Sequence, residues 1–217
     1  MNTPALKAAL KTVLEGELPG LPAQMTMAPM KRATNGKAFS VPDDAKKAAV
    51  LVLFYPGPDG VYLPLMLRND YKGVHSNQVS FPGGTWEEKD GDLLTTALRE
   101  AEEEVGVAPS EIEVMGPLSQ MYIPPSNFLV QPYMAVAEKE PDFVPDPTEV
   151  NELIRARLAD FVDPRYVGTS KIKHRTGSEW EVPSYTINGH VIWGATAMMM
   201  AEVMAVVERA GVLRSAF

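Results

Sequence analysis

Three glutamates occur close together at a spacing that places them on one face of a helix. Glu100, Glu103 and Glu104 lie in the stretch REAEEEVG, residues 99–106. At about 100° per residue they form one stripe beside an apolar face. Two unit charges about 4 Å apart repel by about 4 kcal/mol at an effective dielectric near 20, and a divalent cation between them reverses that sign. Carboxylate oxygens suit Mg²⁺ or Mn²⁺, so the stripe predicts a site for one of these ions.

A glutamate run is also typical of a plain solvated helix face. The neighbouring residues favour the metal interpretation. Gly83 and Gly84 precede the run at a point where a tight turn lets the backbone approach a ligand, and Arg99 adjoins the stripe, where it can orient a carboxylate. Gly106 ends the helix directly after the acids.

The elements that must position these residues follow from periodicity and from turn residues. Residues 92–106 are predicted as a helix with Asp92 as N-cap, and 48–56 and 61–68 as a strand pair joined by PGPDG. Further strands are expected over 112–123, 128–138, 170–176, 179–187 and 190–195, and further helices over 4–15, 148–159 and 195–211; residues 19–37 are expected to be mostly irregular. Strands and helices are interspersed, which favours an α/β (α+β) fold with a mixed sheet and helices on both faces.

Composition bounds the function. The chain has 217 residues, no cysteine and a formal net charge of -8. Thiolate chemistry is excluded, a nucleic-acid duplex is disfavoured as a partner, and no apolar run approaches the roughly 20 residues that span a membrane. The first residues form an interrupted amphipathic pattern rather than an export signal, so we expect a cytoplasmic protein that acts on a small molecule.

The stretch GGTWEEKDGDLLTTALREAEEEVGV resembles the signature of the Nudix hydrolases. Its second half matches every fixed position of that pattern: Arg99, Glu100, Ala101, Glu103, Glu104, Gly106 and Val107. Its first half departs from the pattern, because Asp90 stands where Glu is expected and the following loop is one residue longer. The resemblance implies a Nudix-type α/β/α sandwich over residues 37–217, with residues 1–36 as an N-terminal helix and linker that pack on the domain.

The lengthened loop is similar to that of the coenzyme A pyrophosphatase branch of the family. That branch has a second motif upstream, which PLMLRNDYKGVHSNQVSFPGG resembles in part. The resemblance implies substrate contacts by Arg68, Phe81, Gly83 and Gly84. Fixed positions of the motif differ at Pro64, Met66, Asn69, Gly73 and Asn77. Arg68 could pair with a substrate phosphate or be a surface charge at a strand end.

The resemblance also implies a mechanism in which water attacks a pyrophosphate with Mg²⁺ or Mn²⁺ as cofactor. Glu100 and Glu104 would be the principal ligands, with Glu103 as a further ligand or as a base. Arg99 would orient the acids, and Glu149 is an alternative base on a later loop. Three hypotheses follow: hydrolysis of coenzyme A or acyl-CoA, hydrolysis of ADP-ribose or another nucleoside diphosphate derivative, and a Nudix-fold binding module without activity.

Residues outside these motifs have simpler interpretations. His75, His174 and His190 show no metal-ligand spacing and are expected to be structural or exposed. Trp193 and the methionines of residues 198–200 are expected to pack in the core or at an interface. A homodimer is a family-level expectation, with the apolar closing helix as its candidate surface.

Overall fold

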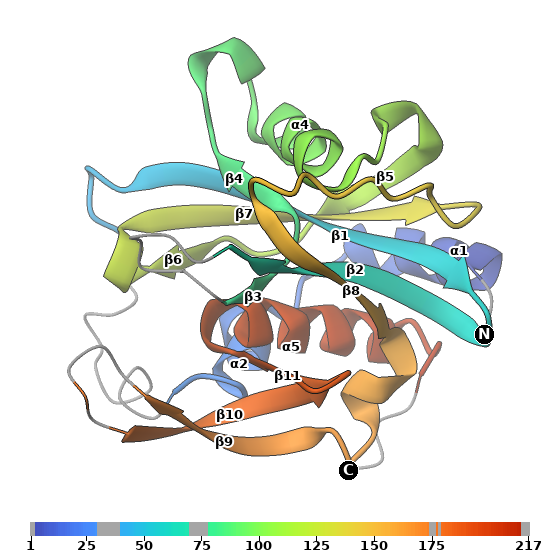
Figure 1. Ribbon diagram of the computed structural model, residues 1–217. Helices are drawn as coiled ribbons and strands as arrows, with labels where there is room; N and C mark the ends of the chain where they lie inside the picture. Colours follow the sequence, from blue (N-terminus) through green and yellow to red (C-terminus); the bar gives the residue numbers. More distant parts are fainter. Residues whose placement is uncertain (1–2, 30–39, 70–77, 174–176, 178, 214–217) are drawn as a thin grey trace.

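The central element is a mixed sheet built around two long neighbouring strands (Figure 1). The computed structural model describes residues 3–29, 40–69, 78–173, 177 and 179–213. Strand β1 (Lys46–Gly57) pairs in parallel with β7 (Phe128–Ala137), whereas the other pairs of this sheet are antiparallel. They are formed by β2 (Gly60–Arg68), β3 (Val79–Ser80), β4 (Gly83–Thr85), β5 (Ile112–Pro117), β6 (Met121–Ile123) and β8 (Val150–Arg157).

Helices cover both faces of this sheet because β1 is apolar on both sides. Leu51 and Leu53 of β1 belong to the cluster that packs against α4 (Leu93–Val105), whereas Val52 and Phe54 belong to the larger cluster on the opposite face. That face is covered by α1 (Thr3–Leu14), α2 (Gly20–Met25) and α5 (Gly194–Arg209). A separate three-stranded sheet of β9 (Val167–Lys173), β10 (Glu179–Ile187) and β11 (His190–Trp193) packs beyond α5 (Figure 1). The predicted α/β sandwich with a mixed central sheet is confirmed.

Helix α5 lies between two layers, which explains its composition. Met198, Met199, Met200 and Met204 are each no more than 8% exposed. Core packing of the methionines is therefore confirmed. The expectation that this helix offers a surface for a homodimer is wrong, because its apolar side chains are already buried within one chain.

One acidic side chain is buried in the same helix. Glu202 is 0% exposed, and its carboxylate accepts hydrogen bonds from Gly20 N at 3.1 Å, Ser119 N at 3.2 Å and Gln24 Nε2 at 2.8 Å. These donors come from α2 and its start and from the loop before β6. Glu202 therefore connects α2 and the loop before β6 to α5 through hydrogen bonds.

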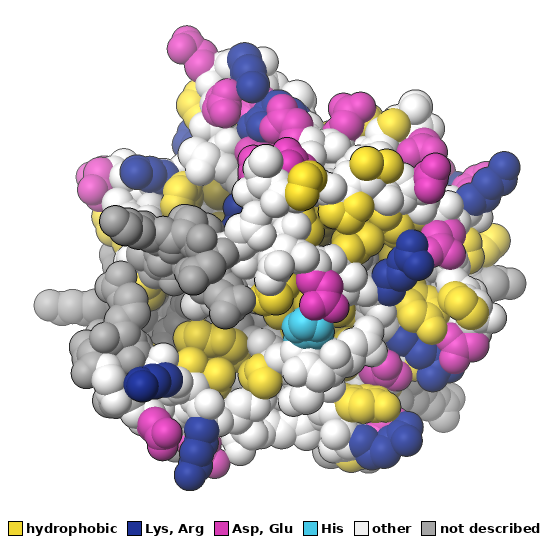
Figure 2. Space-filling model, in the orientation of Figure 1, with side chains coloured by type: hydrophobic (Ala, Val, Ile, Leu, Met, Phe, Trp, Pro, Cys, Tyr) yellow, Lys and Arg dark blue, Asp and Glu magenta, His cyan; other side chains and the backbone are white. Residues whose placement is uncertain are grey.

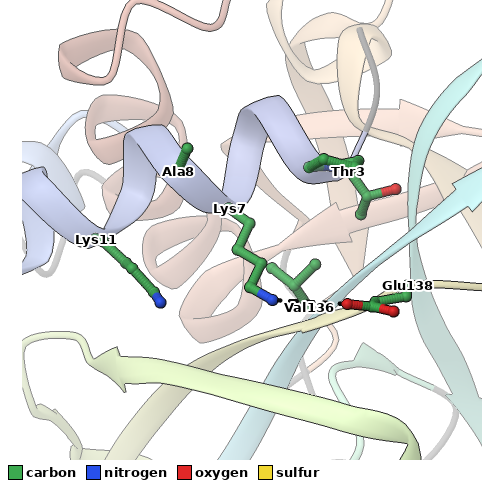
Figure 3. Close-up of a pocket in the computed structure, with 7 residues that line it drawn as sticks. Thr3, Lys7, Ala8, Lys11, Val136 and Glu138 are labelled. Carbon is green, nitrogen blue, oxygen red and sulfur yellow. Dashed lines mark ion pairs between the residues drawn. The ribbon is translucent and has the colours of Figure 1, made fainter.

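Helix α1 is held at the edge of the sheet by ion pairs. Lys7 pairs with Glu113 of β5 and lies 3.8 Å from Glu138, and Lys11 lies 3.2 Å from Glu113. These lysines border a shallow pocket of about 320 Å³ that Thr3 and Val136 also line. Figure 3 shows the residues around it. Both lysines already form ion pairs with carboxylates. We therefore interpret this pocket as a gap in the packing between α1 and the sheet rather than as an anion-binding site.

One local prediction is wrong. The pattern of residues 148–159 predicts a helix, but Val150–Arg157 is strand β8, which pairs along β2 and buries Val150, Ile154 and Ala156. Tertiary contacts override the local pattern here. The stretch predicted to be mostly irregular contains the short helix α2, which the hydrogen bonds to Glu202 hold in place.

Short 3₁₀ turns also occur among the described residues: η2 (Glu88–Asp90), η3 (Pro109–Glu111), η4 (Pro124–Ser126) and η5 (Leu158–Val162). The predicted division between residues 36 and 37 lies outside the described residues. No helix in the described ranges has the length and apolar character needed to cross a membrane.

Candidate active site

Both ends of α4 are fixed, and this sets which residues face the sheet. Asp92 accepts a hydrogen bond from Thr95 N at 2.8 Å, and Gly106 takes a left-handed conformation with φ 76°. These are the predicted N-cap and C-terminal glycine. Figure 2 shows acidic side chains gathered over α4 at the top of the molecule. The helix thereby holds two of its glutamates against the backbone of β4.

Glu104 is the most deeply placed of these acids, with 1% of its surface exposed. One carboxylate oxygen accepts from Gly83 N at 2.7 Å, and the other accepts from Arg68 Nη1 at 3.2 Å. Burial raises the pKa of Glu104 to about 8; Glu100 and Glu149 push the pKa further up, whereas Arg68 and Gly83 oppose the rise. The protein therefore holds a buried carboxylate among like charges with few compensating contacts.

Glu100 reaches the same stretch of backbone one turn earlier. Its carboxylate lies against Gly84 so closely that a methyl group on that glycine would overlap it. Gly83 has φ 151°, and a side chain there would collide with Val50 of β1. Burial also raises the pKa of Glu100. The glycine pair is therefore required for close approach of helix and strands, whereas the predicted approach of its backbone to a ligand stays a prediction.

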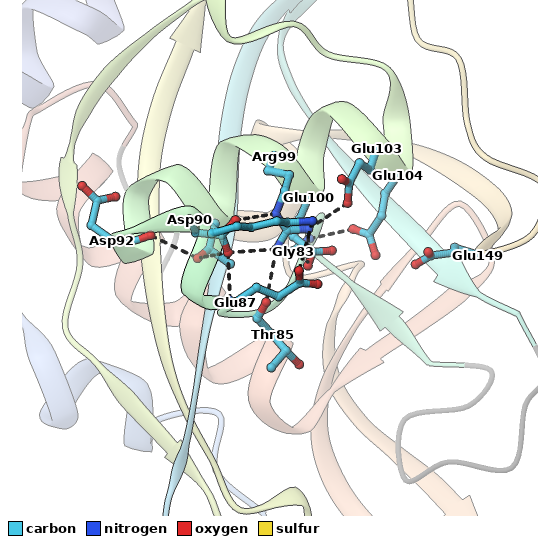
Figure 4. Close-up of polar contacts among 12 residues, drawn as sticks. Gly83, Thr85, Glu87, Asp90, Asp92, Arg99, Glu100, Glu103, Glu104 and Glu149 are labelled. Atoms are coloured by element: carbon cyan, nitrogen blue, oxygen red, sulfur yellow. Dashed lines mark hydrogen bonds and ion pairs between the residues drawn. The ribbon is translucent and has the colours of Figure 1, made fainter.

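Arg99 connects the acids to the loop before the helix (Figure 4). Its guanidinium donates to both oxygens of Asp90, at 2.7 and 3.0 Å, to Glu103 at 2.8 Å and to the carbonyl of Thr85 at 3.2 Å. It also lies 3.0 Å from Glu100. These contacts agree with the predicted orienting role of Arg99.

Asp90 is the residue whose role the sequence analysis missed. It is 7% exposed and also accepts hydrogen bonds from Glu87 N and Thr96 Oγ1. The hydrogen bond from Arg99 holds the pKa of Asp90 well below its usual range. Asp is one methylene shorter than Glu, and the longer loop, with its 3₁₀ turn and left-handed Gly91, brings it within reach of Arg99. The departure from the motif was therefore the signal that could have identified it.

Glu149 enters the site from the loop before β8 (Figure 4). That loop is fastened to the end of α4, because Val144 N donates to the carbonyl of Val105 and Asp146 N donates to the carbonyl of Glu104. The Glu149 carboxylate is half-exposed and lies 3.9 Å from Arg68 Nη2. The structure thus brings Glu149, Arg68 and Glu104 together from three separate elements.

Other predicted site residues do not converge. Glu103 is half-exposed and is held by Arg99. Phe81 is 1% exposed in the main core, so the expectation of a substrate contact through its side chain is wrong. His190 pairs with Glu152 at 3.2 Å, whereas His75 and His174 lie outside the described residues.

In the part of the chain that the structure describes, no three acidic, histidine or cysteine side chains form a ready-made metal cage. Arg68 and Arg99 form ion pairs with the carboxylates that would serve as metal ligands. The donor set nevertheless fits a hard divalent cation, because the carboxylates of Glu100 and Glu104 converge on Gly83 and Gly84 and the charge of Glu100 raises the pKa of Glu104. Glu103 could join them only after leaving Arg99.

Comparisons with known proteins agree with this geometry. The family model described as the NUDIX domain matches residues 45–185. The chain is 30% identical over 164 residues to the "Uncharacterized Nudix hydrolase NudL" of Photorhabdus laumondii, covering 74% of this chain and 84% of that protein. It is 31% identical over 173 residues to "Nudix hydrolase 15, mitochondrial" of Arabidopsis thaliana, covering 74% of this chain but only 58% of that protein.

Among solved structures, a Nudix hydrolase from M. smegmatis, RenU, superimposes with a TM-score of 0.53 at 16% identity. The match covers 76% of this chain and 86% of that protein. At this identity the likeness concerns the fold alone.

Proposed function

Because the chain belongs to the Nudix hydrolase family, we propose that it is a metal-dependent pyrophosphohydrolase of coenzyme A or acyl-CoA. The reaction would add water across one phosphoanhydride bond and release adenosine 3',5'-bisphosphate and phosphopantetheine or its acyl derivative. The observation that carries the hydrolase proposal is the convergence of Glu100 and Glu104 on Gly83 and Gly84.

The chemistry requires charge neutralisation, since an anionic pyrophosphate repels a nucleophile. A bound Mg²⁺ or Mn²⁺ supplies this by neutralising the phosphate oxygens and lowering the pKa of the attacking water. Glu100 and Glu104 would hold the ion, and Glu103 would be a further ligand after its contact with Arg99 is broken. Arg99, anchored by Asp90, is a positioning residue that fixes Glu100 and Glu103.

Glu149 is our candidate for the general base, which would take a proton from the attacking water at its carboxylate. It is half-exposed and raises the pKa of both Glu100 and Glu104, so it faces the acids from the open side. Glu103 is the alternative base. Its hydrogen bond to Arg99 at 2.8 Å favours a structural role over proton transfer.

The choice of coenzyme A rests on the motif from Arg68 to Gly84 and on the lengthened loop. Asp90 lies in that loop and is bound by Arg99, which supports the interpretation that the Nudix signature of residues 83–107 is functional despite its departures from the pattern. A functional signature disfavours the inactive binding module. We also propose a cytoplasmic location, and a homodimer remains a family-level expectation that sedimentation would test.

Product identification after incubation with Mg²⁺ and a substrate panel tests the proposal. The panel contains coenzyme A, an acyl-CoA and ADP-ribose. We expect adenosine 3',5'-bisphosphate from the first two. Hydrolysis of ADP-ribose alone would replace the substrate and keep the reaction class, and no hydrolysis of any nucleoside diphosphate derivative would support the binding module instead.

A further inference from the structure

Arg68 has a position that neither a surface charge nor a simple phosphate ligand explains. It ends strand β2, its side chain is 21% exposed, and its two terminal nitrogens point to two different acids. One lies 3.2 Å from Glu104 and the other 3.9 Å from Glu149. The guanidinium is therefore engaged with two proposed catalytic-site carboxylates.

Arg68 is the counter-ion of Glu104. Among the described residues, Arg68 is the only cation with which Glu104 forms an ion pair. Its other oxygen is bonded to Gly83 N at 2.7 Å. At the oxygen that faces Arg68, a metal ion would meet the guanidinium, and the two cations cannot both approach that oxygen without mutual repulsion.

The Arg68 contact is also loose. At 3.2 Å it is longer than the roughly 2.7–2.9 Å of a strong charge-assisted hydrogen bond. It supplies charge compensation to a buried carboxylate without the tight geometry of Arg99 on Asp90, which measures 2.7 and 3.0 Å. Arg99 thus binds one carboxylate with two nitrogens, whereas Arg68 divides its two terminal nitrogens between Glu104 and Glu149.

We propose that Arg68 is an internal counter-ion that competes with the divalent cation for Glu104, and is therefore a positioning residue that lowers the metal affinity of the site. The inference rests on the proposed function only for the role of Glu104 as a metal ligand. When the metal ion takes Glu104, the guanidinium is released toward Glu149 and toward an anionic substrate. Metal uptake and substrate binding are thereby coupled through one side chain.

Calorimetric titration with Mn²⁺ alone tests the competition, with full-length wild type and Arg68→Met compared. Loss of a charged hydrogen bond from the metal-free state should tighten Mn²⁺ binding by about tenfold. The melting temperature of Arg68→Met should be lower than that of wild type in EDTA, and the deficit should shrink at saturating Mn²⁺.

Lys47→Met is the matched control for charge removal. Lys47 is exposed on β1, three residues from Val50, which pairs with Gly83, and its ammonium lies against the ring of Trp86. We expect its Mn²⁺ affinity to stay within about twofold of wild type, because screened surface charges interact weakly. An equal tightening in both variants would overturn the proposal by showing only a general charge effect.

Unchanged or weaker Mn²⁺ binding in Arg68→Met would also overturn the proposal. A raised KM for coenzyme A in that case would assign Arg68 to substrate phosphate alone.

If Arg68→Met does not fold, Arg68→Lys replaces it. A lysine keeps the charge but not the fork geometry, so the Mn²⁺ affinity of Arg68→Lys should lie between that of wild type and the tenfold tighter value. A Mn²⁺ affinity equal to that of wild type would contradict the proposal. A wild type that binds Mn²⁺ but cleaves no substrate overturns the proposed function only.

Discussion

Two of the glutamates that the structure describes are almost completely buried, one on each side of the central sheet, and their surroundings differ. Glu202 on α5 is 0% exposed and accepts hydrogen bonds from three neutral donors. Glu104 on α4 is 1% exposed and has one neutral donor and one loosely held arginine. Two further acids, Glu100 and Glu149, raise its pKa.

The difference separates a structural acid from a functional one. A buried carboxylate is tolerated when its oxygens are fully hydrogen-bonded, and Glu202 meets that condition by tying chain segments together. Glu104 does not meet this condition, and the nearby acids Glu100 and Glu149 increase the free-energy cost of its negative charge. Acids with perturbed pKa values concentrate at functional sites. The shortage of hydrogen-bond donors and positive charge around Glu104 therefore marks the place where a cation would be accommodated.

The largest expected effect comes from Glu104→Gln. Turnover should fall by about a thousandfold, the scale of losing one strong electrostatic contribution at a reacting centre, while the fold persists because the buried charge is removed. Steady-state kinetics with coenzyme A measures this, with circular dichroism to confirm folding. Glu102→Gln, exposed on the same helix, is the control and should retain wild-type turnover; an active Glu104→Gln would contradict the metal role.

Glu202→Leu should have the opposite profile. It leaves the donors of Gly20, Gln24 and Ser119 without their acceptor, so the free energy of unfolding should fall by about 3–5 kcal/mol. Urea denaturation measures the loss. Glu208→Leu, exposed on the same helix, should change stability by less than about 0.5 kcal/mol. Equal stabilities of the two variants would refute the structural role of Glu202.

Gly84→Ala sharpens the comparison by moving an acid without removing it. The added methyl group overlaps the Glu100 carboxylate, so turnover should fall by about 10- to 100-fold through misplacement of a ligand. The control is Gly168→Ala, since Gly168 has no neighbour within 4 Å of an added methyl group and should tolerate it. Unchanged kinetics in Gly84→Ala would show that the position of Glu100 is unimportant.

The smallest effect concerns the pH dependence of the Asp90–Arg99 contact. Because the pKa of Asp90 is lowered in the folded state, its stabilisation is fully present above the unfolded-state value of about 3.9 and is lost as pH falls. The stability difference between wild type and Asp90→Asn should therefore be constant near neutral pH and shrink below about pH 4. Acid-range urea denaturation measures it; a difference that grows on acidification would contradict the assignment.

Local sequence patterns were sufficient to predict much of the fold. The caps at Asp92 and Gly106 and the β1–β2 hairpin are set by residues close in sequence, and the structure has them as predicted. Strand β8 was predicted as a helix because its residues favour helices locally, and only its pairing along β2 makes it a strand.

The contacts across elements were not predictable. No periodicity links Glu202 to Gly20, 182 positions away, or Arg68 to Glu104, 36 positions away. Phe81 stands in a motif close to Gly83 and was assigned to substrate on that ground, although its side chain packs in the core from the segment between β3 and β4. Motif position indicates proximity to a site, whereas side-chain direction depends on the assembled fold.

The most direct test of the account is the thermal shift produced by Mn²⁺ in wild type, Glu104→Gln and Glu202→Gln. A ligand that binds only the folded state raises the melting temperature. We predict that Mn²⁺ raises the melting temperature of wild type and of Glu202→Gln by similar amounts, although the latter starts lower, and leaves Glu104→Gln unchanged. A full Mn²⁺ shift in Glu104→Gln would contradict the claim that the buried acid of α4 is kept for a metal ion.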